Sequence, residues 1–276
     1  MNHWVKGLVV ALAFMAAGLT AVQGSRQIQP ASSAFDVTQI RADEFFQTEQ
    51  GCFVLKNLET GSMYIYNEAR AKERRPPQST FKIMNALIGL QVKAVKDEYD
   101  IKYWDGITRS LPVWNQDHTL GSAMRNSVVW YYQAMARDIG GQRMQEWLDK
   151  SSYGSCDISG GIDRFWLSSS LTISPVEQVE FLEKLYKETL PFDKKVMKTV
   201  KRIMVQQEGD DYILYGKTGS TEWKEGVARG WFVGFITANG HPYAFAANID
   251  TPAEFAGFRA KEITIQILQK YGLLNG

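Results

Sequence analysis

Hydrophobic and polar positions follow strand patterns near both ends of the chain and a helical period in between. Five segments rich in β-branched and aromatic residues are expected to be strands: Cys52–Asn57, Met63–Asn67, Tyr212–Gly216, Gly230–Ala238 and Tyr243–Ile249. Glu59-Thr60-Gly61 separates the first two strands and Asn239-Gly240 the last two, and both are hairpin turn signals. The sequence therefore predicts antiparallel strand pairs towards both ends of the chain.

The middle of the chain is dominated by apolar residues at helical spacing. From Ser79 to about Glu188 the pattern is mainly helical, broken by loops rich in Gly, Pro and Ser. Ser174-Pro175 marks one helix start there, because serine caps a helix and proline is tolerated in its first turn. The period also predicts an amphipathic helix from Val37 to Phe46 and a last helix from about Phe258 to Tyr271.

This order of elements indicates the fold class. Strands at both ends and helices in the middle predict an α/β protein of the α+β type. We expect an antiparallel sheet built from N- and C-terminal strands, flanked by terminal helices, with a mainly helical lobe inserted at about residues 90–190. The chain has 276 residues, 45% of them hydrophobic, which is ample for a large core, and residues 25–276 are expected to form a single domain.

The first residues resemble a secretory signal rather than part of the fold. Lys6 provides a short positive region, Leu8 to Val22 is apolar without a charge, and small residues follow near Gly24-Ser25. The apolar run is shorter than the ~20 residues of a spanning helix, although an uncleaved membrane anchor remains the alternative. We therefore expect a signal peptide at residues 1–24 and an exported protein, periplasmic or secreted, with no stable membrane span after the signal is removed.

Charge, cysteine and histidine content narrow the functional classes. Lys and Arg number 31 against 30 Asp and Glu, a net charge of +1, so no basic excess favours nucleic acid. Cys52 and Cys156 could form a disulfide after export, but sequence cannot test the geometry. His118 and His241 show no metal-ligand spacing, so we expect no metal site.

Ser79-Thr80-Phe81-Lys82 carries the first chemical signal. Its hydroxyl and amine stand three residues apart, so they would share one face of a helix. Pro76-Pro77 stiffens the approach, and an apolar run follows in which an unpaired ammonium is costly. A serine at a helix start beside an amine supplies the nucleophile, the base and the backbone N–H donors of acyl transfer. The alternative is a capping serine with a surface lysine.

Further motifs follow in order along the chain. Ser127-Val128-Val129 begins 48 residues after Ser79, and Lys217-Thr218-Gly219 begins 90 residues later, after a predicted strand. Phe165-Trp166-Leu167 lies between them, and Arg259 is near the start of the last helix. Glycine in the strand motif would let a substrate lie against the backbone.

Together these motifs make the chain resemble the penicillin-recognising serine acyltransferases, and within them the class D β-lactamases. The more diagnostic stretches are Phe165–Leu182, Trp104-Asp105-Gly106, Trp114-Asn115 and Asp117-His118. The similarity covers essentially the whole mature chain. One departure is Tyr153-Gly154-Ser155, where the family usually has asparagine in place of Ser155.

The resemblance implies a serine hydrolase that opens the β-lactam ring of penicillin-type antibiotics and confers resistance to them. Ser79 would be acylated, and Lys82, carboxylated on its amine by CO2 or bicarbonate, would be the general base. A lysine needs its pKa lowered from ~10.4 by burial to take up CO2, and Trp166 would hold the adduct with its indole N–H. Ser127 would pass a proton to the leaving nitrogen, assisted by Lys217.

The same resemblance assigns the substrate-binding residues. Thr218 and Arg259 would bind the substrate carboxylate, since the planar guanidinium can contact a carboxylate twice. The backbone N–H groups of Ser79 and Ser220 would form the oxyanion hole. Val129, Trp166 and Leu167 would form an apolar wall around Lys82, and Gly219 would let the substrate lie against the strand.

Other functions would use the same residues. A penicillin-binding sensor or receptor domain would be acylated at Ser79 but not deacylated. A D,D-peptidase of cell-wall synthesis would act on a peptide instead. A purely structural binding module would leave Ser79 unmodified by penicillin.

Overall fold

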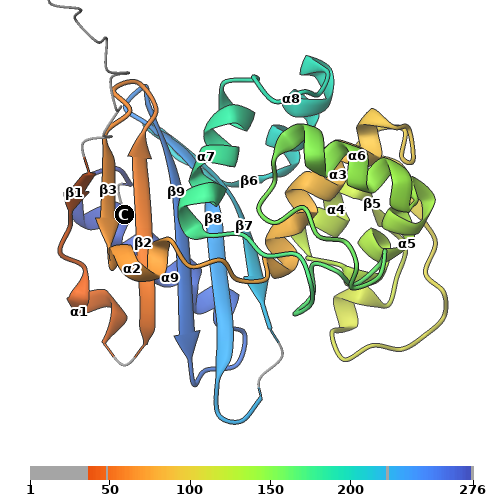
Figure 1. Ribbon diagram of the computed structural model, residues 1–276, viewed down its shortest axis with the longest axis horizontal. Helices are drawn as coiled ribbons and strands as arrows, with labels where there is room; N and C mark the ends of the chain where they lie inside the picture. Colours follow the sequence, from red (N-terminus) through yellow and green to blue (C-terminus); the bar gives the residue numbers. More distant parts are fainter. Residues whose placement is uncertain (1–36, 48, 222–223, 275–276) are drawn as a thin grey trace, which may run out of the picture. The chain divides into compact units, whose positions relative to one another are not determined.

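The computed structural model describes residues 37–47, 49–221 and 224–274, so the predicted signal peptide at residues 1–24 lies outside the described residues. One sheet of seven strands runs through this part of the chain in the order β1-β3-β2-β9-β8-β7-β6 (Figure 1). Neighbouring strands are antiparallel, except that β1 is parallel to β3. The strands are β1 (Val37–Gln39), β2 (Gln50–Asn57), β3 (Met63–Tyr66), β6 (Val205–Glu208), β7 (Tyr212–Ser220), β8 (Ala228–Ala238) and β9 (His241–Thr251).

The predicted fold class is confirmed, because β2 pairs along its whole length with residues 243–250 of β9 and joins strands from the two ends of the chain in one sheet. Both predicted hairpins form, and the β8–β9 turn has Asn239 and Gly240 at φ 50° and 82°, the left-handed values that this short turn requires. The strand predicted at Tyr212–Gly216 continues to Ser220, so Lys217-Thr218-Gly219 lies within β7.

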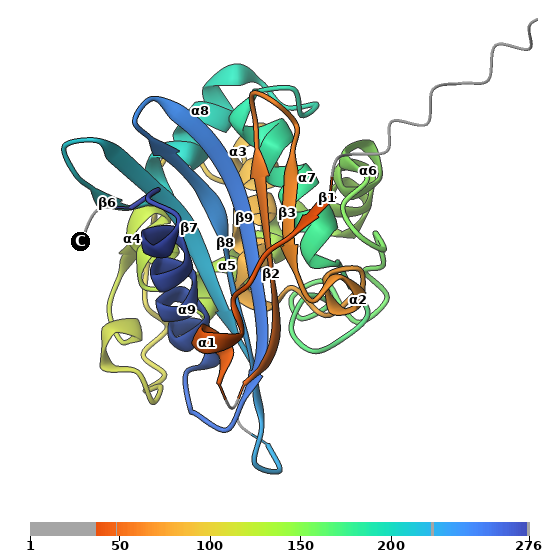
Figure 2. The ribbon, with the colours of Figure 1, turned by 90° about the vertical axis from the view of Figure 1, so that its left-hand side faces the viewer.

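Helices cover both faces of the sheet. The last helix, α9 (Ala256–Lys270), and the short α1 (Asp43–Phe46) lie on one face, and α7 (Pro175–Tyr186) lies on the other (Figure 2). Ser174 caps α7 as predicted: Ser174 Oγ accepts from Glu177 N at 3.2 Å, and Glu177 Oε2 accepts from Ser174 N at 2.8 Å. A separate apolar core fills each side of the sheet.

The central segment is mainly helical, as predicted, and lies beside β7 and β8 (Figure 1). Its core is the helix that follows the nucleophile motif, in which all nine residues from Lys82 to Leu90 are buried. The remaining elements, in chain order, are α2 (Glu68–Ala71), η1 (Gln78–Phe81), α3 (Lys82–Gln91), β4 (Ile101–Lys102), η2 (Pro112–Trp114), β5 (His118–Thr119), α4 (Leu120–Arg125), α5 (Val129–Ile139), α6 (Gly141–Ser151) and α8 (Lys194–Ile203).

The helix predicted from Val37 to Phe46 is wrong. Val37–Gln39 is instead an edge strand in register with Met63–Ile65, and Ile40 N continues the pairing by donating to Ile65 O at 3.0 Å. Only Asp43–Phe46 is helical. Residues 37–39 pair with β3 in spite of their helical spacing. Pairing with the edge of the sheet gives their backbone N–H and C=O groups hydrogen-bond partners.

Cys52 and Cys156 are both free thiols. Cys52 is buried in β2, and burial raises the pKa of its thiol to about 12. No helix in the described part of the chain combines the length and apolarity that a membrane span needs.

The pairing of β7 with β8 allows a direct test of the fold next to the Lys217 motif. A Cβ placed on Gly234 would lie 1.9 Å from Tyr215 O, so the two strands would have to separate. Gly234→Ala should lower the free energy of unfolding by about 3 kcal/mol. In Gly121→Ala the added carbon meets nothing closer than 3.5 Å, so this matched variant should change stability by less than ~1 kcal/mol. Urea titrations would measure both, and equal effects would contradict the described strand packing.

Candidate active site

Ser79 and Lys82 form a buried pair at the start of the central helix. Residues Gln78–Phe81 make a 3₁₀ turn that runs directly into α3 at Lys82, so the serine precedes the α-helix instead of lying in its first turn. Lys82 Nζ donates to Ser79 Oγ at 2.7 Å. Lys82 has 0% and Ser79 9% of its surface exposed. These burial values exclude a surface lysine at this position.

Burial lowers the pKa of Lys82 and so favours its neutral form. Loss of hydration lowers its pKa well below the ordinary value, and the nearby charge of Lys217 lowers it further. The ring of Tyr132 lies close by, with its centroid 5.5 Å from Lys82 Nζ. A lowered pKa favours the neutral amine, which is the form that can accept a proton from a hydroxyl.

Ser127 and Lys217 form a second serine–lysine pair. Lys217 Nζ on β7 donates to Ser127 Oγ at 3.0 Å and to Thr218 O at 2.8 Å. Ser127 sits between α4 and α5 with φ 54°, a left-handed value that few residues other than glycine adopt. Burial lowers the pKa of Lys217 to about 7, and the charge of Lys261 adds to this effect. This pair can therefore hold or release a proton near neutral pH.

Both serines open onto a cavity of about 1410 Å³ between the sheet and the central helices. Gly219 allows the strand wall to approach the nucleophile, because a Cβ there would lie 3.1 Å from Pro77 O and 3.3 Å from Ser79 N. Eight of the residues predicted from sequence line this cavity: Ser79, Ser127, Val129, Leu167, Lys217, Thr218, Gly219 and Ser220.

Trp166 is buried behind this wall. Its ring stacks on Phe81, the neighbour of Lys82, with centroids 5.3 Å apart. Its Nε1 is buried and has no hydrogen-bond partner among the described residues. An indole N–H without a partner is costly in a protein interior, so this donor is available for an acceptor that binds near Phe81.

Ser155, which departs from the usual asparagine, braces the loop that carries Trp166. Ser155 Oγ accepts from Thr172 N at 3.0 Å, and Ser155 N donates to Thr172 O at 2.8 Å. The preceding Gly154 has φ 56° and packs against the same backbone, where a Cβ would lie 2.2 Å from Thr172 O. The serine hydroxyl thus holds the two ends of the loop together.

The structure does not bring Arg259 to the cavity, contrary to the expectation from sequence. Arg259 Nε donates to Glu49 Oε1 at 2.7 Å, and its Nη2 donates to Phe45 O at 3.3 Å. Glu49 is only 8% exposed, so this ion pair is largely removed from water. Arg259 is therefore turned towards the segment after α1.

Several residues at the cavity were missed by the reasoning from sequence, and two of them are polar residues close to the predicted motifs. Lys261 on α9 and Gln78 before the nucleophile both line it. Helical spacing could have found Lys261, because it falls one turn after Gly257, which lies against Ser220. Nothing in the sequence signals Gln78, since its position depends on a left-handed φ of 53°.

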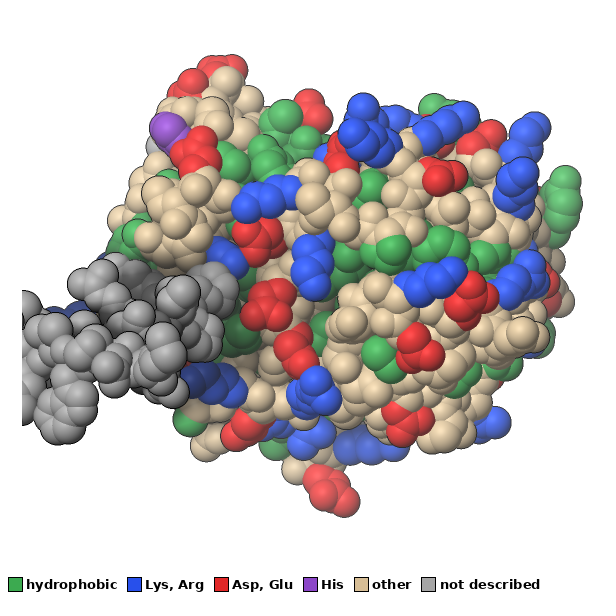
Figure 3. Space-filling model, turned by 45° about the horizontal axis from the view of Figure 1, so that its top comes forward, with side chains coloured by type: hydrophobic (Ala, Val, Ile, Leu, Met, Phe, Trp, Pro, Cys, Tyr) green, Lys and Arg blue, Asp and Glu red, His purple; other side chains and the backbone are tan. Residues whose placement is uncertain are grey.

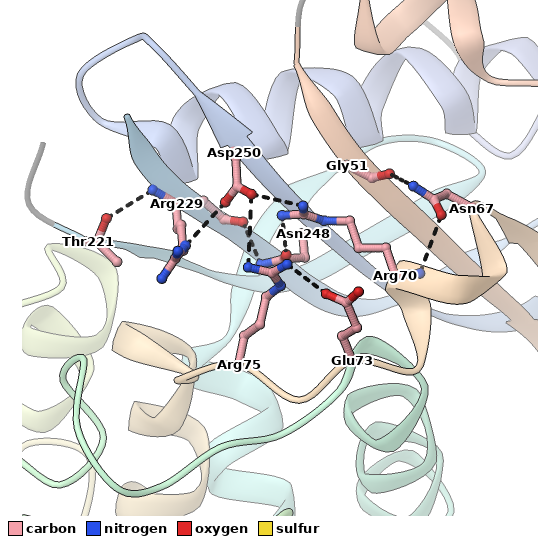
Figure 4. Close-up of polar contacts among 10 residues, drawn as sticks. Gly51, Asn67, Arg70, Glu73, Arg75, Thr221, Arg229, Asn248 and Asp250 are labelled. Atoms are coloured by element: carbon pink, nitrogen blue, oxygen red, sulfur yellow. Dashed lines mark hydrogen bonds and ion pairs between the residues drawn. The ribbon is translucent and has the colours of Figure 1, made fainter. Parts of the chain in front are cut away.

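A cluster of arginines around Asp250 fixes the segment that leads to the nucleophile. Arg70 donates to Asp250 Oδ2 at 2.9 Å and to Asn248 Oδ1 at 2.8 Å on β9 (Figure 4). Asp250 also faces Arg75 at 3.9 Å and Arg229 at 3.4 Å. Because Asp250 has several cationic neighbours, its pKa is lowered despite its partial burial. The cluster ties residues 70–75 to the sheet shortly before Ser79.

Neither the surface charges nor the acidic residues in the described part of the chain indicate a second functional site. Lys and Arg side chains are interspersed with Asp and Glu on the face seen in Figure 3. Among the residues that the structure describes, no three His, Cys, Asp or Glu side chains cluster as metal ligands would.

Known proteins share both the sequence and the fold. Residues 51–269 match the penicillin-binding protein transpeptidase domain family. The chain is 55% identical over 279 residues to the probable beta-lactamase YbxI of Bacillus subtilis, with 100% of each chain covered. The solved class D beta-lactamase BAT-2 shares 60% identity with a TM-score of 0.82, covering 86% of this chain and 98% of that one.

A receptor domain is also similar in structure. The C-terminal domain of the Bacillus licheniformis BlaR penicillin-receptor has a TM-score of 0.84 but only 33% identity, covering 88% of this chain and 99% of that one. The higher identities are to β-lactamases. With its buried serine–lysine pair and these similarities, the chain belongs to the penicillin-binding protein transpeptidase domain family and, within it, to the class D β-lactamases.

Proposed function

We propose that this protein opens the β-lactam ring of penicillin-type antibiotics through Ser79, hydrolyses the acyl-enzyme and thereby confers resistance. The observation that carries the proposal is the 2.7 Å bond between Lys82 Nζ and Ser79 Oγ, with the lysine fully buried. In the carboxylated form described below, Lys82 would be the general base that takes the hydroxyl proton as the serine attacks. We place the mature protein outside the cytoplasm, periplasmic or secreted, where it meets such antibiotics.

The backbone N–H groups of Ser79 and Ser220 would stabilise the oxyanion formed by attack on the lactam carbonyl. Gly219 supports this role, because its missing side chain lets β7 lie against Ser79 N. One donor of this kind is worth ~3 kcal/mol in the transition state. Val129 and Leu167 would supply the apolar wall opposite the strand.

Ser127 would protonate the lactam nitrogen as the ring opens. Its Oγ lies 3.0 Å from Lys217 Nζ, whose pKa of about 7 allows a proton to be passed in either direction near neutral pH. Thr218 lies beside this pair, with its Oγ1 3.4 Å from Lys217 Nζ, and would bind the substrate carboxylate.

The residues around Lys82 fit the carboxylated lysine that is typical of class D enzymes. A neutral buried amine is the form that reacts with CO2, and the unpartnered indole N–H of Trp166 could donate to the added carboxylate. When formed, the carboxylate on Lys82 would supply a general base whose oxygen atoms lie further from the backbone than the amine nitrogen. No metal or separate cofactor is part of the proposal.

The rival functions differ in the fate of the acyl-enzyme. A receptor of the BlaR type would bind one penicillin per protein and stop, whereas a β-lactamase continues to release product. A D,D-peptidase would cleave a peptide ending in D-alanyl-D-alanine. Continuous turnover of a chromogenic cephalosporin, against a single stoichiometric burst, separates the hydrolase from the receptor.

Ser79→Ala should reduce turnover by at least ~10³-fold, because the nucleophile is lost while Lys82 and the cavity remain. Ser62→Ala is a matched control, since it deletes a hydroxyl in the β2–β3 hairpin, and should keep full turnover. Circular dichroism would check that both variants fold. Unchanged hydrolysis by a folded Ser79→Ala protein would rule out the acyl-enzyme.

Lys82 should give a carbamate signal in ¹³C NMR after addition of labelled bicarbonate. Below its lowered pKa the amine is protonated and cannot take up CO2, so occupancy and activity should rise with pH through that pKa. Activity lost in mild acid should return with added bicarbonate.

Trp166→Phe removes the indole N–H and should lower this carbamate signal and slow deacylation more than acylation. Trp147 lies in α6 and stacks on Phe192. The control variant Trp147→Phe should therefore change neither the carbamate signal nor the rate of deacylation. Lys82→Ala should abolish the signal. Full activity in CO2-depleted buffer with no labelled signal would mean that Lys82 acts unmodified.

A further inference from the structure

Thr80 closes the turn that contains the nucleophile. The residue is buried, with 1% of its surface exposed. Its Oγ1 donates to Pro77 O at 2.7 Å, and its backbone N donates to the same oxygen at 3.2 Å. The side-chain bond is the shorter of the two, so the position of the Pro77 carbonyl depends on how the Thr80 hydroxyl is oriented.

The Pro77 carbonyl lies next to the proposed oxyanion hole. A Cβ on Gly219 would lie 3.1 Å from Pro77 O and 3.3 Å from Ser79 N, so the carbonyl and this N–H both approach the same point of β7. Proline has no N–H, so the carbonyl is the only backbone group through which a hydrogen bond can hold Pro77. A shift of this carbonyl would therefore move the N–H of Ser79 relative to the strand.

Gln178 of α7 orients the Thr80 hydroxyl. Its Nε2 donates to Thr80 Oγ1 at 2.9 Å across 98 residues of sequence, and its side chain is fully buried. A hydroxyl has one proton and two lone pairs, so an oxygen that accepts from an amide keeps its own proton for another acceptor. Here that acceptor is Pro77 O. The amide of Gln178 thus directs the Thr80 proton to the Pro77 carbonyl.

The helix that carries Gln178 is fixed to the sheet. Gln178 N donates to Ser174 O at 2.9 Å in the capped first turn of α7, and α7 packs on β2, β8 and β9 (Figure 2). Aromatic rings add a second connection between α7 and the nucleophile turn. The ring centroid of Phe181 on α7 lies 5.0 Å from that of Tyr153, which in turn lies 5.8 Å from that of Phe81. Gln178 is therefore held on a rigid element, as precise positioning requires.

We propose that Gln178 is a positioning residue for the reaction. Through Thr80 it holds Pro77 O, and it thereby sets the position of the Ser79 N–H that would stabilise the oxyanion. This inference rests on the proposed function and adds to it a residue that acts without contact to the substrate. Its effect should appear in the transition state of acylation, where the oxyanion develops, and not in the binding of the intact substrate.

Gln178→Met removes the amide and keeps a side chain of similar length. The rate constant of acylation by a penicillin, measured in the pre-steady-state burst, should fall about tenfold, the loss expected for one buried hydrogen bond. The dissociation constant of the non-covalent complex should change less than about twofold. An unchanged rate constant of acylation would overturn the proposal.

Val179→Ala is the matched control on the same helix. It removes buried apolar volume from α7 and so lowers stability, but it leaves the amide of Gln178 in place. At a temperature where urea titration shows both variants to be folded, Val179→Ala should keep the wild-type rate constant of acylation. An equal fall in the two variants would mean that Gln178 only stabilises α7, and would contradict the positioning role.

Substitutions at Thr80 test the same bond from its other end. Thr80→Val removes the hydroxyl and should slow acylation at least as much as Gln178→Met, whereas Thr80→Ser should restore most of this loss. Because Gln178 acts through Thr80, the double variant should be no slower than Thr80→Val alone. Additive losses would show that the two side chains act independently. Equal rates in Thr80→Val and Thr80→Ser would reject the proposal even if Gln178→Met did not fold.

The ¹³C carbamate signal and the wild-type protein separate this inference from the proposed function. Gln178→Met should keep the wild-type signal, because its effect is on the oxyanion and not on the base at Lys82. Loss of the signal would mean that the substitution disturbs the whole site, and would contradict the assigned role. Wild-type protein that forms no acyl-enzyme would refute the proposed function itself. Normal wild-type turnover with unchanged acylation in Gln178→Met would refute only this inference.

Discussion

The burial of Lys82 is the interaction on which the site depends. A charged amine removed from water is strongly disfavoured, and Lys82 Nζ contacts a serine hydroxyl instead of a carboxylate that would keep it charged. The unfavourable free energy of desolvation appears as a lowered pKa, which turns a poor base into a usable one. The apolar residues of α3 and its neighbours therefore have a chemical role as well as a structural one.

The site forms where the two halves of the described fold meet. The nucleophile turn η1 packs against β7 and β8, while α3, into which it leads, packs against α5 and α8. Strand β7 therefore supplies one wall and the central helices the other, and the cavity lies between them. Neither half alone contains both a nucleophile and the donors that would stabilise an oxyanion.

Polar contacts hold these walls in position. Asp250 and Asn248 on β9 bind the arginines of the segment before Ser79, and Gln78 bonds to the turn that carries Trp166. The pair between Glu49 and Arg259 fixes α9 from its outer side, leaving Lys261 on the inner side. Each contact joins segments far apart in sequence.

The sequence by itself determined the fold class, the two hairpins, the capped start of α7 and eight of the residues that line the cavity. These features depend on local properties of the sequence. They are the alternation of apolar and polar residues, the turn residues, a serine before a proline, and short motifs recognised by their residue types. The buried character of Lys82 was also readable, because an apolar run on all sides of a helix cannot face water.

Only the tertiary structure decided the rest. Val37–Gln39 is a strand because it pairs with the edge strand β3. The local spacing of apolar residues does not reveal this pairing. Arg259 pairs with Glu49, a residue distant in sequence, while Lys261 of the same helix lines the cavity. Gln78 gained its contacts through a left-handed backbone that depends on two other segments. Contacts between residues distant in sequence depend on which groups the packing of the whole fold brings together. Local sequence patterns do not contain this information.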